Sequence, residues 1–351
     1  MKNNKNNGIL MRFLQNRISM SVIALCILLL FNLFFTPGFF KIEINNGHLF
    51  GSLIDILKNG APLILVSMGM TLVMATGGAD ISVGSVAALS AMIIAQLYAG
   101  TFSFAAGNAG QNTDFPLGIA ILIGLFVALL CGSFNGFLVA HRKVEPFIAT
   151  LIMQAAARGL AYIVSDGRVV TVHGATFQFF GGGYLLGIPF SMYIVLAVAL
   201  VVYLFVRKTS YGLYLEAVGS NATSSYFSGL RVNRITWLAY AITGLLAGGA
   251  GFLLSSNVSS ADANMTGMYL ELDAIMACVL GGNSMTGGRF TLLGSFIGAL
   301  IVRTLTITIY MKGIPSESIL MFKAIVLLAV GIIQTVNIGE LREKLGKKAE
   351  V

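Results

Sequence analysis

Long apolar stretches separated by short polar segments recur along the whole chain. A helix needs about 20 apolar residues to cross the roughly 30 Å hydrocarbon core of a bilayer. Ten stretches approach that length: 18–35, 57–76, 81–98, 116–140, 147–165, 189–206, 235–254, 271–286, 291–311 and 318–336. The pattern predicts an all-α integral membrane protein with about ten transmembrane helices. The signal is weakest in 57–76 and 271–286, because each is short or polar at one end.

The composition supports this fold class and excludes an ordinary soluble domain. Of the 351 residues, 56% are hydrophobic and only 10% are charged, whereas a soluble domain carries about 25% charged residues. The net charge of +8 does not indicate nucleic-acid binding, because the basic residues form no face interleaved with aromatic residues. They lie mainly in the polar segments between the apolar stretches.

The distribution of lysine and arginine predicts the orientation. With a cytoplasmic N-terminus and ten crossings, fifteen basic residues fall on the cytoplasmic side: Lys2, Lys5, Arg12, Arg17, Arg142, Lys143, Arg207, Lys208, Arg231, Arg234, Arg289, Arg342, Lys344, Lys347 and Lys348. Four fall on the outer side: Lys41, Lys58, Arg168 and Lys312. This excess satisfies the positive-inside rule. It predicts cytoplasmic tails over 1–17 and 337–351, on either side of a transmembrane domain over 18–336.

Sequence signatures of metal binding and catalysis are missing. The three cysteines lie in apolar stretches, and the three histidines have no ligand-like spacing. The chain has no phosphate-binding G-x-x-x-x-G-K-[ST] loop, since the only Gly-Lys pair, Gly346-Lys347, is followed by Lys348. It also lacks the nucleophile and zinc-protease motifs. We therefore expect no enzyme activity, no metal and no cofactor in this chain.

The longest polar segment predicted on the cytoplasmic side runs from 207 to 234. Residues 211–218 are compatible with a helix that Gly219 breaks, and Asn221 is placed to cap a second short helix through Ser228. A short helix pair on the cytoplasmic face has the shape needed to sit in a groove of a soluble partner. A structured connector without a partner is the alternative.

Two glycine-rich interruptions lie between apolar stretches. The first, 76–85, contains Asp80 and Ser82, and the second, 281–288, contains Asn283. Irregular backbone at membrane depth is tolerated only where it is buried in protein or lines an aqueous cavity. Asp80 with Ser82 either caps the following helix or forms a gate or substrate contact. The substrate-pathway interpretation extends to Asn283.

Basic residues also occur inside the apolar stretches, at Arg158, Arg303 and Lys323. Charges at this depth usually face the interior of the bundle. Thr150, Gln154 and Arg158 recur every four residues and therefore share one helix face. This polar stripe either lines a transport pathway or makes interhelical hydrogen bonds. Arg303 and Thr306 form a shorter stripe, while Lys323 lies near enough to a helix end to snorkel.

Three G-x-x-x-G pairs lie within apolar stretches, at Gly132/Gly136, Gly244/Gly248 and Gly294/Gly298. Lipid provides no hydrophobic drive for helix association, so close packing at small residues takes its place. The pairs predict that helices approach closely at these positions.

Several of these segments together resemble a known family. The runs T-G-G-A-D-I-S-V-G-S at 76–85, E-A-V-G-S-N-A-T-S-S-Y-F-S-G-L at 216–230 and L-G-G-N-S-M-T-G-G at 280–288 are similar to sugar-type permeases of ATP-binding-cassette importers. Residues 46–57, 261–264 and 270–275 look closest to the galactofuranose branch. The resemblance extends from about residue 46 to 335.

The resemblance implies a set of partners. A ten-helix permease would pair with a second permease, identical or related, and with two cytoplasmic ATPases that bind ATP and magnesium. An extracytoplasmic sugar-binding protein would deliver the substrate. The segment 207–234 would be a cytoplasmic coupling loop that docks on the ATPase through Glu216, Gly219, Asn221, Ser228 and Gly229. The sequence departs from the family at Ser224-Ser225, where two alanines are usual, and at Ala79, where a larger apolar residue is usual.

We therefore expect a multi-pass subunit of the bacterial cell (inner) membrane that imports a small monosaccharide. The candidate substrate-pathway residues are Asp80, Ser82, Thr150, Gln154, Arg158, Asn283 and Arg303. The alternative is a secondary transporter driven by an ion gradient, which would usually show carboxylates at the midplane. Here the acids lie at the ends of the predicted helices and in loops, and Asp80 is the nearest candidate for a midplane carboxylate. A membrane receptor or an intramembrane enzyme has less support, and pentose, hexopyranose and hexofuranose substrates all stay open.

Overall fold

A computed structural model describes residues 17–45, 47–100, 115–315, 318–325 and 328. The longer helices are α2 (Arg17–Phe35), α3 (Ser52–Ala75), α4 (Val83–Tyr98), α5 (Leu117–Ala140), α6 (Pro146–Ser165), α8 (Phe190–Lys208), α11 (Val232–Val258) and α13 (Leu292–Met311). Four shorter helices are α7 (Ala175–Gly182), α9 (Tyr211–Ser220), α10 (Ala222–Phe227) and α12 (Leu270–Leu280). The strands are β1 (Glu43–Asn45), β2 (His48–Phe50), β3 (Val170–Thr171), β4 (Tyr184–Leu185), β5 (Ile188–Pro189) and β6 (Ser260–Ala261).

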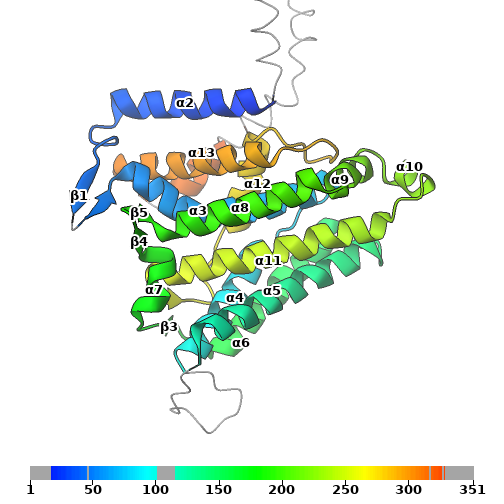
Figure 1. The fold of residues 1–351 in the computed structure, drawn as a ribbon, viewed down its shortest axis with the longest axis horizontal. Helices are drawn as coiled ribbons and strands as arrows, with labels where there is room; N and C mark the ends of the chain where they lie inside the picture. The colour runs from blue at the N-terminus through cyan, green and yellow to red at the C-terminus, as the bar shows by residue number, and fades with distance from the viewer. Residues whose placement is uncertain (1–16, 46, 101–114, 316–317, 326–327, 329–351) are drawn as a thin grey trace, which may run out of the picture.

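The long helices lie side by side and run between the same two ends of the molecule (Figure 1). Six helices, α3, α5, α6, α8, α11 and α13, are long and apolar enough to cross a membrane. The apolar helices α2 and α4 are somewhat shorter. These observations confirm a helical, multi-pass membrane protein. Most of the predicted crossing at 318–336 and both tails lie outside the described residues.

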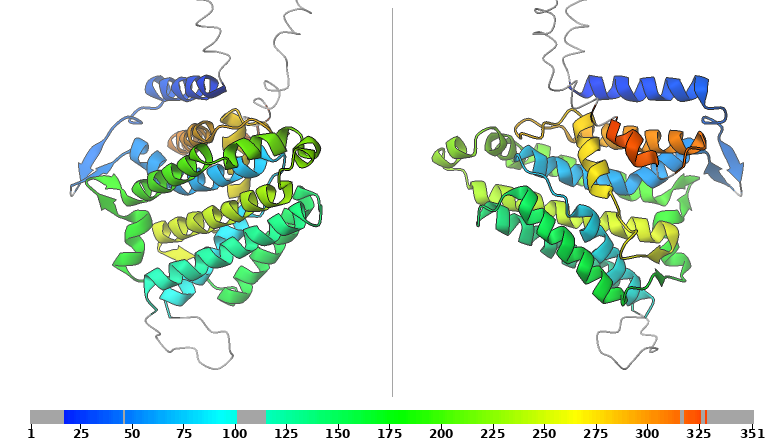
Figure 2. Two further views of the ribbon diagram at one scale, coloured as in Figure 1. Left: turned by 45° about the vertical axis from the view of Figure 1, so that its right-hand side comes forward. Right: turned by 180° about the vertical axis from the view of Figure 1, so that it is seen from behind.

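The predicted crossing at 271–286 is different in the structure. Helix α12 has 11 residues, which rise only about 16 Å, and it lies at a steep angle to the long helices (Figure 2). Its start, at Glu271, approaches Gly84 of α4, whereas the carbonyl of Leu280 at its end accepts a hydrogen bond from Ser21 of α2, 2.7 Å away. This segment therefore crosses the bundle rather than the bilayer, because the glycines after Leu280 end the helix early.

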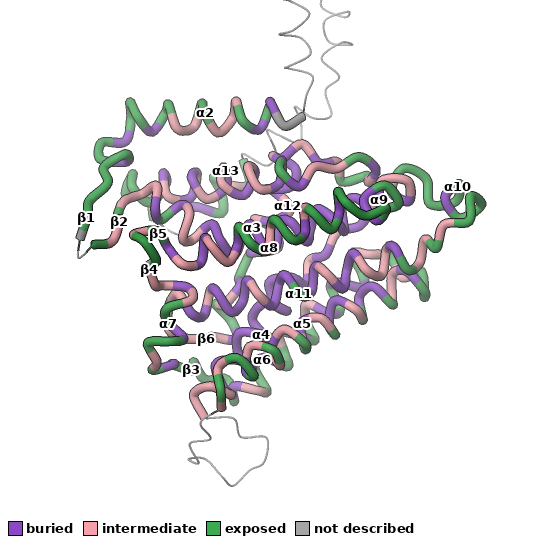
Figure 3. Tube along the Cα trace, viewed as in Figure 1, coloured by how far each residue is buried: buried purple, intermediate pink, exposed green. Residues whose placement is uncertain are grey.

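Helix α11 occupies the centre of the bundle and packs against α3, α4 and α5. Buried residues concentrate in α3, α4 and α11, while α5, α6 and α8 present exposed apolar side chains on the outside (Figure 3). That distribution is expected of a bundle whose outer helices face lipid, because apolar side chains are stable both in the core and against hydrocarbon.

The predicted glycine contacts are confirmed. A Cβ atom added to Gly132 of α5 would lie 2.4 Å from the Tyr240 carbonyl oxygen of α11 and 2.8 Å from the Gly244 Cα. On α13, a Cβ added to Gly298 would lie 1.9 Å from the Ala277 carbonyl oxygen of α12. Helix backbones touch at both crossings, so a larger residue at either position would force the helices apart.

The two ends of the bundle differ in structure and charge. One end carries three two-stranded sheets, β1–β2, β3–β6 and β4–β5, and the other carries α9 and α10 (Figure 1). The loops and helix ends at the α9–α10 end carry seven basic residues: Arg142, Lys143, Arg207, Lys208, Arg231, Arg234 and Arg289. A hydrogen bond of 2.8 Å from Lys143 Nζ to Asn233 Oδ1 joins the α5–α6 loop to the first turn of α11.

Candidate functional site

The loop between α8 and α11 folds into two short helices with one buried and one exposed face. Tyr211, Leu215 and Val218 of α9 are buried, and the Tyr211 hydroxyl donates to the Ile235 carbonyl at 3.2 Å. Burial raises the pKa of the Tyr211 hydroxyl, which keeps it a neutral donor. At the tip of α10, Tyr226 is 68% and Phe227 is 81% exposed. Two adjacent exposed aromatic residues are typical of a protein contact surface.

Two details of this loop were predicted, and one prediction is wrong. Asn221 caps α10, because its side-chain oxygen accepts from the Ser224 amide at 2.9 Å. The Ser228 hydroxyl donates back to the Ser224 carbonyl, and Gly229 follows with a φ of 84°. Gly219, however, does not break the first helix, since α9 continues through Ser220. The glycine there allows a close backbone contact instead of a turn, because an added Cβ would lie 1.8 Å from the carbonyl oxygen of Ala75, the last residue of α3.

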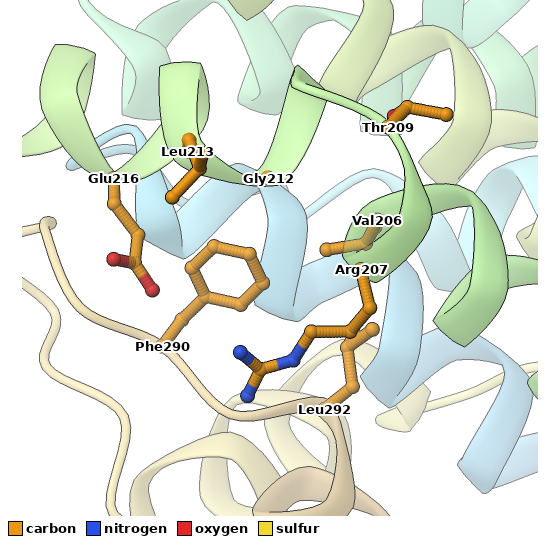
Figure 4. Close-up of a pocket in the computed structure, with 8 residues that line it drawn as sticks. All are labelled: Val206, Arg207, Thr209, Gly212, Leu213, Glu216, Phe290 and Leu292. Carbon is orange, nitrogen blue, oxygen red and sulfur yellow. The ribbon is translucent and has the colours of Figure 1, made fainter.

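A pocket of about 180 Å³ opens beside this loop. In Figure 4, the Glu216 and Arg207 side chains lie on either side of the Phe290 ring, which comes from the segment before α13. The lining residues are Val206, Arg207, Thr209, Gly212, Leu213, Glu216, Phe290 and Leu292. The pocket therefore lies between α9 and the segment that leads into α13.

The first interruption, 76–85, is held by a buried carboxylate. Asp80 is 1% exposed and accepts two hydrogen bonds, from the Ser82 amide at 2.9 Å and from the Ser82 hydroxyl at 2.6 Å. Asn135 of α5 donates to the Ser82 oxygen at 2.9 Å. Asp80 thus closes a tight turn ahead of α4, close to the predicted cap, while the Ser82 hydroxyl itself makes no capping bond to α4.

Unused hydrogen-bonding groups surround this turn. The Oδ1 atom of Asn135 and the hydroxyl of Tyr240 are buried and have no partner among the described residues. The Tyr240 hydroxyl lies over Gly78, since a Cβ added to Gly78 would be 2.5 Å from it. Unpaired buried polar atoms are rare in folded proteins, and they often mark a site that a water, ligand or second conformation uses.

The second interruption, 281–288, is closed by Asn283. This buried side chain donates to the Ser295 hydroxyl at 2.7 Å and accepts from the Thr291 amide at 2.7 Å. It also donates to the Cys278 carbonyl at 3.1 Å. Asn283 therefore joins the end of α12 to the start of α13.

The polar stripe of α6 faces the segment before α12. Arg158 donates to the Ala263 and Thr266 carbonyls at 2.7 and 3.0 Å. Gln154 lies 3.5 Å from the Glu271 carboxylate, at the limit of a hydrogen bond. Thr150 is buried and bonds only within the first turn of its own helix in the described structure.

Sequence reasoning missed Glu271, which joins this cluster from the first turn of α12. Its side chain is buried, and its Oε2 atom has no hydrogen-bond partner in the described part of the chain. The sequence shows an acid at a helix end, a position that usually is solvated. Only the fold reveals that Glu271, Gln154 and Arg158 meet between α4, α6 and α12.

Arg303 lies elsewhere, on the face of α13 that meets α3. Its Cγ atom would be 3.8 Å from a Cβ added to Gly60. Lys323 forms an ion pair with Asp273 of α12 at 2.7 Å, so it is not simply directed to the membrane surface. The sequence-predicted pathway residues thus occupy four places: the Asp80 turn, the Asn283 closure, the α6 stripe and the α13–α3 contact.

The comparisons with known proteins place this arrangement in a family. Residues 52–331 match the model of the branched-chain amino acid transport system permease component family, and the chain belongs to it. The chain is 41% identical to the galactofuranose transporter permease protein YtfT of Escherichia coli over 314 residues, which cover 90% of this chain and 88% of the relative. No solved structure matches the chain.

Other relatives are permeases for different sugars. The chain is 34% identical to the fructose import permease protein FruF of Bifidobacterium longum over 97% of this chain and 94% of the relative. It is 33% identical to the ribose import permease protein RbsC of Haemophilus influenzae over 93% of this chain and 95% of the relative. These matches confirm the resemblance to sugar permeases of ATP-binding-cassette importers and a multi-pass location in the bacterial cell membrane.

Proposed function

We propose that this chain is the membrane-spanning subunit that carries a small monosaccharide into the cytoplasm, driven by ATPase subunits bound to it. The observation that carries the proposal is the α9–α10 loop, with its exposed pair Tyr226 and Phe227, on a chain that is similar over nine-tenths of its length to a sugar permease. The loop offers the ATPase an aromatic docking surface, flanked by the basic residues of the same end.

The basic residues also assign the two ends of the bundle to the two sides of the membrane in this proposal. The concentration of lysine and arginine at the α9–α10 end favours the cytoplasm for that end. The sheets at the other end would then face the sugar-binding protein. A second permease subunit, identical or related, completes the assembly in this proposal.

For the sugar pathway we propose the cluster of Gln154, Arg158 and Glu271, together with the Asp80 turn. Sugars present many hydroxyl groups, and a site that recognises them needs buried donors and acceptors with spare capacity. Glu271 Oε2 has that capacity in the described structure, and Gln154 has only a long hydrogen bond, to Glu271 Oε1. Asn283 and Thr150 use their polar groups within the fold, which favours a structural contribution from both.

Reconstitution tests the function as a whole. The chain is purified from its native membrane with its co-purifying proteins and placed in liposomes that contain ATP, with the sugar-binding protein outside. Galactofuranose, fructose and ribose serve as labelled probes. We expect uptake of one of them to require ATP and to continue when ionophores dissipate proton and sodium gradients. A chain that purifies alone and moves sugar without ATP is instead a gradient-driven carrier.

A matched pair of variants tests the pathway. Gln154→Ala removes a polar group from the cluster, and the loss of one hydrogen bond to substrate, about 1 kcal/mol, reduces uptake about fivefold. Thr150→Val on the same helix face removes a hydroxyl that bonds only within its own helix turn in the described structure, so uptake stays within about twofold. Equal uptake by wild type and Gln154→Ala, at equal amounts of assembled protein, would remove Gln154 from the pathway.

A further inference from the structure

The pocket beside α9 lies where an apolar helix ends. Helix α8 is apolar along most of its length and ends in the basic pair Arg207 and Lys208. A basic pair at the end of an outward-facing apolar helix marks the boundary between hydrocarbon and water. The pocket lies at this boundary, between the end of α8, the start of α9 and the segment before α13. It is therefore at the depth of the lipid headgroups.

The pocket carries one charged side chain of each sign. The Phe290 ring lies between the Arg207 guanidinium and the Glu216 carboxylate (Figure 4). Neither side chain forms an ion pair with another residue of the described ranges. A cation and an anion that are separated on the wall of one pocket are complementary to a ligand that itself carries both charges.

An apolar stripe on α8 leads toward the pocket. Leu196, Leu200 and Leu204 are exposed and recur every four residues, so they share one face of the helix. Arg207 follows Leu204 by three positions and continues this face into the last turn. An acyl chain that lies along the stripe therefore brings its headgroup to the guanidinium. This continuity favours a membrane lipid over a soluble ligand.

We infer that this pocket binds the headgroup of a zwitterionic phospholipid with a primary amine, of the phosphatidylethanolamine type. Arg207 donates hydrogen bonds to the phosphate oxygens, because its planar guanidinium matches their geometry. The Glu216 carboxylate accepts from the ammonium group, and the Phe290 ring between them adds a cation–π contact. The acyl chains follow the Leu196–Leu204 stripe. The pocket volume of about 180 Å³ is many times the roughly 15 Å³ that one water needs.

Native mass spectrometry of the full chain in detergent tests the site. Phosphatidylethanolamine, phosphatidylglycerol and phosphatidylcholine with identical acyl chains are added at equal concentrations. We expect about fivefold higher retention of phosphatidylethanolamine, because Glu216 repels a purely anionic headgroup and a quaternary ammonium donates no hydrogen bond to it. Soluble phosphoethanolamine does not displace the lipid, because it lacks the acyl chains. Equal retention of the three lipids, or displacement by phosphoethanolamine, overturns the inference.

Two charge-removing variants assign the roles of the side chains. Arg207→Gln lowers retention of phosphatidylethanolamine about fivefold, whereas Glu216→Gln retains phosphatidylethanolamine and phosphatidylglycerol within about twofold of each other. Lys208→Gln and Glu145→Gln are the matched controls, because each removes the same charge from an exposed residue of the same end that does not line the pocket. Both controls keep the wild-type preference. Wild-type lipid retention in Arg207→Gln and Glu216→Gln would contradict the assignment.

The lipid measurement uses neither sugar nor ATP, so its outcome is independent of the proposed function. Because the family resemblance assigns Glu216 to ATPase docking, co-purification of ATPase subunits is measured for the same variants. Loss of the ATPase from Arg207→Gln and Glu216→Gln, with lipid retention as in wild type, makes the pocket a protein contact and overturns the lipid site. A changed lipid preference with normal ATPase co-purification supports it.

Discussion

The two glycine-rich interruptions look alike in sequence but are stabilised differently. Each follows the end of a helix, and each contains a buried side chain, Asp80 or Asn283, that can bond to several partners and is 1% exposed. Asn283 uses both ends of its amide, since it accepts from Thr291 and donates to Ser295 and Cys278. The second interruption is therefore closed on itself as a fixed link between α12 and α13.

The first interruption, in contrast, is surrounded by buried polar atoms that lack hydrogen-bond partners among the described residues. Asp80 bonds to Ser82 and Ser82 to Asn135, but Asn135 Oδ1 and the Tyr240 hydroxyl are left without partners among the described residues. A fully satisfied polar network rigidifies the structure around it, whereas a partly satisfied one can gain bonds in another state. The second interruption therefore holds the fold with its polar groups satisfied, and the first has buried polar groups available for further hydrogen bonds.

The largest expected effect comes from removing the carboxylate of the first interruption. Asp80→Leu leaves the Ser82 amide and hydroxyl buried without their acceptor. Losing two charge-assisted hydrogen bonds costs about 3 kcal/mol, so we expect little folded protein in a detergent thermal-melting assay and no measurable uptake.

Asp80→Asn is the control that separates hydrogen bonding from charge. Its amide oxygen can still accept from Ser82, so we expect it to fold, with a melting temperature well above that of Asp80→Leu. Equal melting temperatures for the two variants would contradict the role given to these hydrogen bonds.

Asn283→Ala has the next largest effect and tests the second interruption. It removes the acceptor of the Thr291 amide and the donor to Ser295, which costs about 2 kcal/mol. We expect a lower melting temperature of the solubilised protein, with uptake per folded molecule close to that of wild type. Uptake lost at an unchanged melting temperature would show instead that Asn283 belongs to the sugar pathway.

Features that depend on neighbouring residues could be predicted from the sequence. The apolar stretches indicated the long helices, because length and hydropathy suffice for that. Asn221 was predicted to cap α10, and Gly132 and Gly298 to lie at close helix contacts, because capping and small-residue packing have local signatures.

Features that depend on distant residues could not be predicted. From the sequence, Glu271 is expected to be a solvated acid. The fold brings it beside Gln154, 117 positions away. From the sequence, Gly219 is expected to break a helix. In the structure it lies inside α9, where α9 contacts the end of α3. The crossing expected at 271–286 failed for a similar reason, since hydropathy gives no direction to a helix that crosses the bundle.

The variant with the smallest expected effect on stability tests whether the unpartnered polar atoms around the first interruption are used in transport. Tyr240→Phe removes a buried hydroxyl that has no partner in the described structure and keeps the ring. An unpaired buried hydroxyl is unfavourable, so the free energy of unfolding of the variant equals that of wild type or exceeds it by up to about 1 kcal/mol. Its melting temperature is therefore unchanged or raised. If the hydroxyl is used only in another state of the transport cycle, uptake falls severalfold while stability is kept. Unchanged uptake with raised stability would show that the hydroxyl is unused throughout the cycle, and the first interruption would then differ from the second only in its packing.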